Sequence, residues 1–302
     1  ALISTEYDLH RDEYLYLDQA NHLAWGYLSV PPVTSWFSYI ILLLGKSVFW
    51  VRFFPALFGA LTILIVWKTT ELLGGNLFAL ILSATAILLS ALLRLNLLYQ
   101  PNSIDVLCWA LFYYCLIQFI YSNKDKWLLI AAVVFAFGFL NKYNVLFMAM
   151  GLFPALLITK QRKIFAGKHL YYAAGLALLL VLPNLVWQYQ NDFPVIYHMQ
   201  LLTETQLNNS SRTDFIKEQL IYYLGAFYVL IAGIISFFLY QPFHKYRVLF
   251  WSYVFTLIIF MYFKAKGYYA MGLHPVYFAF GSVYLEKLLD RKTWVRYLKP
   301  VM

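Results

Sequence analysis

The sequence predicts an all-α, polytopic integral membrane protein, and three observations support this fold class. First, 62% of the 302 residues are hydrophobic and only 12% are charged, whereas a soluble domain is about half apolar and a quarter charged. Second, the mean hydropathy is +0.65. Third, the apolar residues form runs near the ~20 residues that a helix needs to cross a bilayer. A single segment in lipid satisfies its backbone polar groups only as a helix, so we expect a transmembrane helical bundle.

The first apolar segment is too short to be a span. Residues 33–45, "VTSWFSYIILLLG", follow Pro31 and Pro32 and end at Gly45. This length is typical of an amphipathic helix that lies at the membrane interface. The chain starts at Ala1 and shows no signal-peptide pattern, so we expect either a fragment or the loss of a leading segment.

About nine candidate spans follow this segment along the chain. Two of them are short and meet at "NKYN", and no fixed-period repeat is present. The candidate spans are residues 48–71, 76–96, 104–121, 127–141, 144–159, 169–187, 218–240, 247–263 and 268–286.

The basic residues indicate an orientation for these spans. Most of them lie in or beside the loops on one side of the membrane, so this side is predicted to be cytoplasmic. The net charge of +9 is then loop charge, and we expect no nucleic-acid partner. The cytoplasmic segments are 72–75, 122–126, 160–168, 241–246 and 287–302, and the periplasmic or lumenal segments are 1–47, 97–103, 142–143, 188–217 and 264–267. Three domains result: a periplasmic catalytic loop with amphipathic helices at 1–47, a transmembrane bundle at 48–286 and a basic cytoplasmic tail at 287–302.

Acidic residues gather on the predicted outer side. Asp12 and Glu13 are adjacent in "HRDEYLYLD", and on a helix they would point about 100° apart. One of them could serve chemistry while the other holds structure, or both could belong to a solvated helix end. Asp105 lies just inside a span in "LYQPNSIDVLCW". It could face a cavity, because a carboxylate facing lipid is costly, or it could cap the helix that begins nearby.

Basic and aromatic residues lie on the same predicted side. Lys142 stands at the junction of the two short spans in "FGFLNKYNVLF", where it could bind an anionic ligand or extend toward lipid headgroups. The long outer loop adds His198 and Arg212, and the last outer loop, "KAKGYYAMG", adds Lys266, Tyr268 and Tyr269. Acids and cations on one face suit a negatively charged ligand that is attacked by a nucleophile needing a base.

Other chemistries find little support in the sequence. It contains no GxxxxGK[ST], GxGxxG, HExxH or GxSxG motif, and the six histidines show no zinc spacing. Cys108 and Cys115 share an apolar segment and are interpreted as buried thiols. The aromatic residues Tyr14, Trp25 and Tyr27 could form sugar-stacking walls or an interfacial belt.

The ordered set of outer motifs resembles a known family. "RDEYLYLDQANHLAWGYLSVPP", "LYQPNSIDVLCW", "FLNKYNVLF", "LPNLVWQYQNDFPVIYHM" and "KGYYAMGLHPVYFAFG" follow one another over nearly all of the chain. This order is similar to that of bacterial membrane glycosyltransferases of the protein O-mannosyltransferase and lipid A aminoarabinose transferase superfamily, which are related to dolichyl-phosphate-mannose-protein mannosyltransferases and share the GT-C fold. The family takes a polyprenyl-phosphate sugar as donor on the periplasmic or lumenal face of the membrane.

The resemblance implies roles for individual residues. The family's catalytic aspartate, the first acid of the "DE" pair, falls on Asp12, and its second acidic position falls on Asp105. The phosphate-binding lysine falls on Lys142 in "GFLNK". Lys266, Tyr268 and Tyr269 match the stretch that helps to hold the lipid phosphate. Arg212 matches, with loose spacing, a phosphate-binding arginine of the long loop.

An inverting glycosyl transfer to a cell-envelope glycan, lipid or protein at the inner membrane is the implied function. No cofactor is implied, although a divalent cation stays open. Some relatives carry a charged residue just before the "PP" pair, where this chain has Ser29 and Val30, and this difference weakens a metal site there. Relatives often continue beyond the last span, where acceptor recognition could lie. The alternatives are a transporter or flippase, a non-catalytic binder of a lipid-linked sugar, and a polymerase or ligase of surface polysaccharide.

Overall fold

A computed structural model describes residues 9–207 and 211–290, and these residues form helices joined by turns, with no β-strand among them. The predicted all-α fold class is therefore confirmed for this part of the chain. Most of the predicted cytoplasmic tail at 287–302 lies outside the described residues. The α-helices are α1 (Arg11–Asp18), α2 (Val33–Leu43), α3 (Val48–Leu72), α4 (Leu77–Leu88), α5 (Leu92–Leu95), α6 (Pro101–Ser122), α7 (Lys126–Asn141), α8 (Val145–Ile158), α9 (Lys168–Gln190), α10 (Pro194–Thr205), α11 (Arg212–Ile221), α12 (Phe227–Leu239), α13 (Arg247–Tyr262) and α14 (Pro275–Asp290).

Short 3₁₀ segments connect several of these helices. They are η1 (Gln19–Asn21), η2 (Lys160–Ala166), η4 (Leu224–Ala226), η5 (Gln241–Tyr246) and η6 (Gly267–Leu273). Every predicted span overlaps one to three consecutive helical elements, and the predicted interfacial segment at 33–45 coincides with α2. The long loop at 188–217 contains α10, a helix that the hydropathy pattern did not predict.

Fewer helices meet the length and hydropathy criteria for a membrane span than the nine that the sequence predicts. Three of the described helices, α3, α6 and α9, are long and apolar enough to cross a membrane alone. The number rises to five if each of two bent pairs, α8 with η2 and α11 with α12, forms one span. The count of nine is therefore not confirmed, because α4 and α7 are apolar but shorter than a bilayer-crossing helix.

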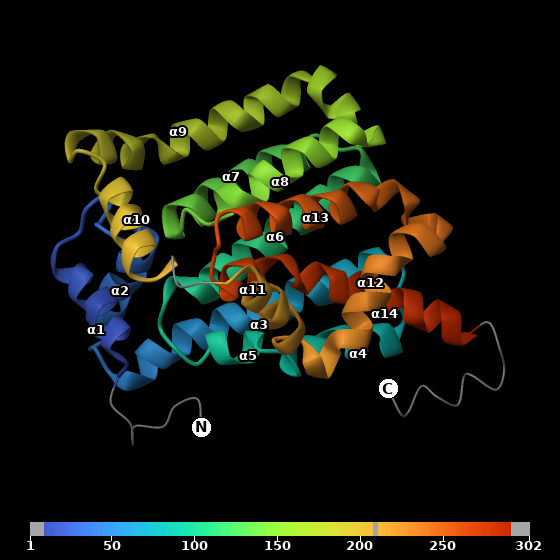
Figure 1. Cartoon of the computed structure of the whole chain (residues 1–302), viewed down its shortest axis with the longest axis horizontal. Helices are drawn as coiled ribbons and strands as arrows, with labels where there is room; N and C mark the ends of the chain where they lie inside the picture. The colour runs from blue at the N-terminus through green and yellow to red at the C-terminus, as the bar shows by residue number, and fades with distance from the viewer. Residues whose placement is uncertain (1–8, 208–210, 291–302) are drawn as a thin grey trace.

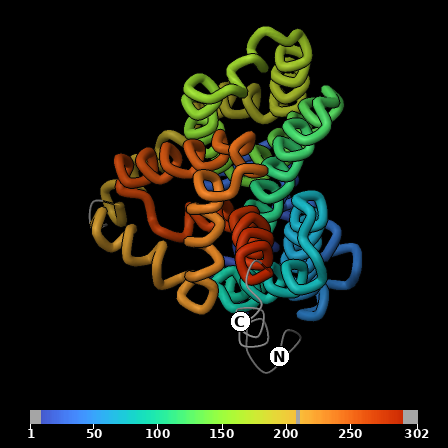
Figure 2. Tube along the Cα trace, turned by 90° about the vertical axis from the view of Figure 1, so that its right-hand side faces the viewer, coloured from blue at the N-terminus to red at the C-terminus, as the bar shows by residue number. Residues whose placement is uncertain are grey.

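Helix α6 lies at the centre of the bundle (Figure 1). It packs against α3 and α7, and 72% of its most apolar window is buried. In contrast, only 17% of the corresponding window of α9 is buried, and α9 packs mainly on α7. Figure 2 shows α9 at the periphery. Its exposed leucines, such as Leu179 with 64% of its surface exposed, are suited to face lipid rather than water.

One close helix pairing depends on two glycines. Helices α12 and α14 pack along their length, and a Cβ at Gly281 would lie 1.9 Å from the carbonyl oxygen of Val229. A Cβ at Gly233 would lie 2.2 Å from the carbonyl oxygen of Tyr277. Small residues let helices in a membrane approach this closely and gain dispersion contacts. This pairing holds α14 in the core, so that η6, which precedes it, is placed at one end of the bundle.

Candidate active site

Glu13 fixes the position of the first helix. Its side chain is fully buried, and Oε2 accepts a hydrogen bond from the His10 backbone N–H at 2.7 Å, which completes a capping box at the start of α1. Oε1 accepts from Arg52 Nη1 on α3 at 2.5 Å and from the Tyr99 backbone N–H at 2.7 Å. Of the two adjacent acids, Glu13 therefore holds structure: it ties α1 to α3 and to the chain that leads into α6.

Asp12 has a different environment from its neighbour. Its side chain is 38% exposed, and Oδ2 accepts a hydrogen bond from Gln100 Nε2 at 3.2 Å. The Nε atom of Arg11 lies 3.4 Å from Oδ1. One turn further along α1, burial and the nearby Asp12 raise the pKa of Tyr16 to about 12. The hydroxyl of Tyr16 therefore stays protonated near neutral pH, while the Asp12 carboxylate remains accessible from the solvent.

Lys142 lies between α7 and α8, where the sequence places the junction of two short apolar segments. Its Nζ donates a hydrogen bond to Asn102 Oδ1 at 2.8 Å and lies 4.6 Å and 5.2 Å from the ring centroids of Tyr269 and Tyr268. Burial lowers the pKa of this lysine, and the nearby carboxylate of Asp105 opposes the shift. The side chain thus points into the protein rather than toward lipid headgroups.

Two carboxamides stand between this lysine and Asp12. Asn102 Nδ2 donates to Gln100 Oε1 at 2.8 Å, and Gln100 in turn donates to Asp12. Hydrogen bonds therefore connect the predicted phosphate-binding cation to the predicted base through Asn102 and Gln100. Neither Asn102 nor Gln100 was among the site residues predicted from the sequence.

Asp105 is buried in the first part of α6, with 3% of its surface exposed. It accepts hydrogen bonds from Trp109 Nε1 and Asn144 Nδ2, each at 2.9 Å. Because α6 begins at Pro101, Asp105 lies beyond the first helical turn and does not cap the helix. Asn144 also donates to the backbone carbonyl of Tyr269 at 2.7 Å. Asp105 therefore helps, through Asn144, to hold the tyrosine whose ring lies beside Lys142.

The η6 segment carries the last group of predicted residues. The Gly267 backbone N–H donates to Glu218 Oε2 at 2.8 Å, and its carbonyl accepts from Gln219 Nε2 at 3.0 Å. A Cβ at Gly267 would lie 2.1 Å from Glu218 Oε2, so this close approach needs glycine. The adjacent Tyr268 and Tyr269 rings meet edge to face at 4.6 Å. Helix α11 thereby holds the aromatic pair in place.

The other three predicted site residues are Lys266, Arg212 and His198, and only Lys266 is shown to lie near Lys142. Lys266 donates to Gln206 and is close enough to Lys142 to contribute to its lowered pKa. Arg212 is exposed, and its Nε donates to the Met261 carbonyl at 3.2 Å. His198 is half-buried on α10. Among the described contacts, neither Arg212 nor His198 bonds to the three predicted acids.

A cavity of about 660 Å³ opens beside Asp12. Its polar end is lined by Asp12, Gln100, Asn102 and Tyr268, and Arg94 on α5 also lines it. Its remaining walls are mainly apolar and come from the stretch before α6 and from residues 221–225. A carboxylate at the polar end of a largely apolar cleft is an arrangement typical of ligand sites.

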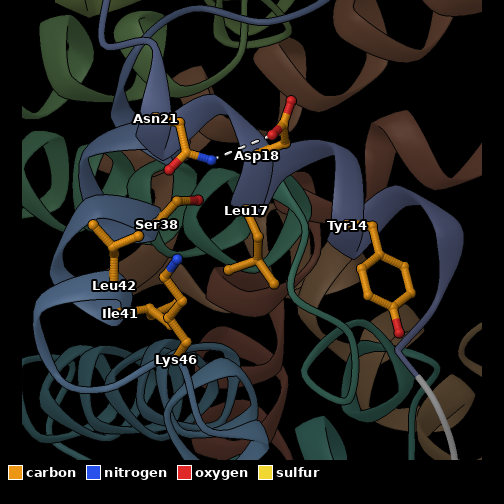
Figure 3. Close-up of a pocket in the computed structure, with 8 residues that line it drawn as sticks. All are labelled: Tyr14, Leu17, Asp18, Asn21, Ser38, Ile41, Leu42 and Lys46. Carbon is orange, nitrogen blue, oxygen red and sulfur yellow. Dashed lines mark hydrogen bonds between the residues drawn. The ribbon is translucent and has the colours of Figure 1, made fainter.

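Helix α1 has a second face, which lines a smaller cavity of about 230 Å³ (Figure 3). Tyr14, Leu17 and Asp18 line this cavity together with Lys46 from the turn after α2, and Asp18 Oδ1 accepts a hydrogen bond from Asn21 Nδ2 at 3.3 Å. Tyr14, a candidate sugar-stacking residue, therefore belongs to this cavity and not to the one beside Asp12.

The remaining candidate groups are structural. The hydroxyl of Tyr27 bonds to the backbone carbonyls of Gln19 and His22 and so closes the loop after α1. Trp25 packs edge to face on Trp36, with ring centroids 5.8 Å apart. The two cysteines, Cys108 and Cys115, are free and buried, as predicted. In the described part of the chain, no three His, Cys, Asp or Glu side chains are grouped so as to hold a metal ion.

Comparison with known proteins places the chain in a family. Residues 29–187 match the family described as dolichyl-phosphate-mannose-protein mannosyltransferase. A lipid A galacturonosyltransferase, RgtD from Rhizobium johnstonii, is 26% identical over 195 residues, which are 64% of this chain and 41% of that protein. The chain thus spans less than half the length of this curated relative. The resemblance inferred from the motifs is confirmed.

Solved structures share the fold. ArnT from Cupriavidus metallidurans bound to undecaprenyl phosphate superposes with a TM-score of 0.79 at 14% identity, over 99% of this chain and 60% of that chain. The archaeal oligosaccharyltransferase AglB from Archaeoglobus fulgidus, in complex with an inhibitory peptide and a dolichol-phosphate, gives a TM-score of 0.58 at 13% identity. It is covered over 48% of its length by 96% of this chain.

Proposed function

This chain belongs to the dolichyl-phosphate-mannose-protein mannosyltransferase family, and from that premise we propose that it transfers a sugar from a polyprenyl-phosphate donor to a cell-envelope acceptor. The observation that carries the proposal is the position of Asp12. It is the solvent-accessible member of the acidic pair, it lines the 660 Å³ cavity, and amide hydrogen bonds connect it to the half-buried Lys142. The lipid phosphates bound in the solved structures of similar fold, undecaprenyl phosphate and dolichol-phosphate, support a lipid-phosphate ligand.

The proposed reaction is an inverting displacement at the sugar's anomeric carbon. Asp12 accepts the proton from an acceptor hydroxyl while that oxygen forms a bond to C1. The bond between C1 and the phosphate oxygen breaks, and the polyprenyl phosphate leaves with both bonding electrons. General-base assistance of this kind contributes about 10²–10⁴-fold to a rate. No step needs a nucleotide or an external oxidant or reductant.

Lys142 would stabilise the phosphate that leaves. Its ammonium has three N–H donors, and Asn102 takes one of them, so two remain for phosphate oxygens. The rings of Tyr268 and Tyr269 flank the same ammonium and limit its movement. A preorganised donor in such a site typically contributes about 3 kcal/mol to stabilising the transition state. Asp105 would help to hold Tyr269 in place through its hydrogen bond with Asn144.

Lys266 and Arg212 would extend the phosphate site on the side of α11 and η6. Lys266 contributes to the lowered pKa of Lys142, which indicates that a second positive charge is near. Arg212 begins α11, the helix that holds Gly267 and hence the aromatic pair. The distribution of basic residues supports an active site on the periplasmic face of the inner membrane, with the segment at 1–47 on that face.

A transfer assay tests the proposal. The protein in nanodiscs is incubated with polyprenyl-phosphate sugars that carry radiolabelled mannose, galacturonate, arabinose or aminoarabinose, together with an envelope lysate that supplies acceptors. We expect label to move from lipid to acceptor with the wild type and not with Asp12→Asn. Donor binding without transfer from any of these donors, in both proteins, would instead support a transporter or a lipid-binding protein.

A further inference from the structure

The hydrogen bonds between Lys142 and Asp12 form one oriented row. Lys142 donates to Asn102 at 2.8 Å, Asn102 donates to Gln100 at 2.8 Å, and Gln100 donates to Asp12 at 3.2 Å. An ammonium can only donate and an ionised carboxylate can only accept. The two charged ends therefore determine which way each carboxamide points, with its oxygen toward Lys142 and its NH₂ group toward Asp12.

This orientation makes the row stronger than isolated amide contacts. Hydrogen bonds with an ionised partner are shorter and about twice as strong as neutral ones, and bonds in a chain polarise one another where the local dielectric constant is low. The bond between Asn102 and Gln100 is neutral by itself. It lies between two charge-assisted bonds, and all three bonds run in the same donor-to-acceptor direction, from Lys142 toward Asp12.

The backbone that carries the two carboxamides is also held in place. Gln100 is the residue before α6, and Asn102 lies in its first turn. Between them, the Pro101 carbonyl accepts a hydrogen bond from Asn141 Nδ2 at 2.8 Å, and Asn141 is buried. Because Asn141 immediately precedes Lys142, the start of α6 and the end of α7 are joined both by this bond and by the row of side chains.

The row determines which atoms stay available for chemistry. Gln100 occupies Oδ2 of Asp12, whereas Oδ1 has Arg11 at 3.4 Å, a side chain that is 90% exposed. Oδ1 is thus the oxygen that can accept a proton with little rearrangement. At the other end, Asn102 engages one N–H of Lys142 and leaves the others for an anion.

We propose that Gln100 and Asn102 are positioning residues that hold the base Asp12 and the phosphate-binding Lys142 in a fixed relative arrangement. This inference rests on the proposed glycosyl transfer. Asp12 must lie at the face of the sugar opposite to the departing phosphate, so the distance between base and cation has to match the length of a sugar phosphate. Two carboxamides of defined polarity set that distance without neutralising either charge.

Isosteric variants separate this role from simple packing. Gln100→Leu removes the bond to Asp12, and Gln100→Glu keeps the size of the side chain but presents only acceptor oxygens to the carboxylate. We expect kcat to fall about ten- to a hundredfold in both variants, since a hydrogen bond to a charged group is lost, with the KM for the donor unchanged. Asn102→Leu should lower kcat similarly and also raise the donor KM, because Lys142 loses its partner.

The two positioning residues, Gln100 and Asn102, should act as a unit. In the double variant Gln100→Leu with Asn102→Leu, we expect a kcat close to that of Asn102→Leu alone, because the second substitution breaks a row that is already interrupted. Gln118 offers a matched control on the same helix: its Nε2 donates to the Tyr114 hydroxyl at 2.8 Å. Gln118→Leu and Gln118→Glu should leave both kcat and KM unchanged.

The outcomes are distinct. Suppose that the wild type transfers sugar and Asp12→Asn does not. Full activity in Gln100→Glu, or effects on kcat that multiply in the double variant, would then overturn the positioning role of Gln100 and Asn102. The proposed function would not be affected. If folded wild type transfers no sugar from any donor, the proposed function fails and the positioning role fails with it. Elution volume in gel filtration and the thermal-unfolding midpoint identify variants that have lost their fold.

Discussion

At the end of the bundle away from α1, acids and bases meet directly. Glu71 accepts a hydrogen bond from Lys68 at 2.8 Å, and Glu286 accepts from Lys287 at 2.6 Å. At the α1 end (Figure 1), the amides of Gln100 and Asn102 connect Asp12 to Lys142, and Asp105 accepts hydrogen bonds from the Trp109 indole and the Asn144 amide. Direct pairing neutralises a charge, whereas amide-mediated contact orients a charge and leaves it available to a ligand. The same residue types are thus paired with one another at one end and left available to a ligand at the other.

The α1 end also contains a direct pair whose carboxylate is buried, and that pair sharpens the comparison. Glu13 and Arg52 meet at 2.5 Å with the carboxylate fully buried. Next to it, Asp12 takes a single amide hydrogen bond and remains 38% exposed. Of the two adjacent carboxylates, Glu13 is thus paired with a cation and Asp12 is left available to a ligand. Substitution of Glu13 should affect stability, and substitution of Asp12 should affect the transfer rate.

The largest effect is expected from Asp12→Asn. Loss of the base should lower the transfer rate by about 10²–10⁴-fold, measured as label transferred under saturating donor, with little change in the thermal-unfolding midpoint. Asp18→Asn is the matched control, because Asp18 lies on the same helix but faces the smaller cavity (Figure 3). Equal losses in the two variants would contradict the assignment of Asp12 as base.

Glu13→Leu should chiefly affect stability. The substitution leaves the Arg52 guanidinium and the Tyr99 N–H without their partner in a buried place, at a cost of about 3 kcal/mol or more. The thermal-unfolding midpoint in detergent should therefore fall, whereas Glu71→Leu at the far end should leave it nearly unchanged because that ion pair is exposed. A stable but inactive Glu13→Leu protein would indicate that Glu13 takes part in chemistry.

Lys142→Met should weaken binding of the lipid phosphate. Removing one preorganised cation is expected to cost about 3 kcal/mol in the transition state, or roughly a hundredfold in kcat/KM for the donor. Lys245→Met is the control, since Lys245 also lies over two tyrosine rings, Tyr121 and Tyr246, each at 5.0 Å. Unchanged affinity for undecaprenyl phosphate in Lys142→Met, measured with the purified protein, would contradict the role of this lysine.

The smallest expected effect is a pH dependence. Burial lowers the pKa of Lys142 below the ordinary lysine value of 10.5, so the ammonium loses its proton at a lower pH than an exposed lysine does. The affinity for undecaprenyl phosphate should therefore decrease as the pH rises through the lowered pKa of Lys142. Lys142→Arg keeps its charge and should bind with an affinity that stays constant over the same alkaline range. An identical alkaline decrease in both proteins would assign the effect to another group.

Some predictions from the sequence needed only local information. Long apolar runs predict helices because lipid offers no other backbone partners, and each predicted span coincides with helical structure. The position of Lys142 between two short apolar segments is likewise a local feature. The span count was less predictable: α4, with bounds Leu77–Leu88, ends well before the apolar run does, and such breaks depend on packing between helices.

The sequence by itself determined the helical membrane class and the family, and it predicted that Asp12, Asp105 and Lys142 share one side of the membrane, because composition, hydropathy and ordered motifs are properties of the chain. Only the tertiary structure decided that Glu13 is buried against Arg52 while Asp12 stays open, and that Gln100 and Asn102 connect Asp12 to Lys142. These contacts join residues as far apart as 88 positions. A carboxamide carries no pattern that reveals its partner, since its hydrogen bonds depend on which groups folding brings within reach.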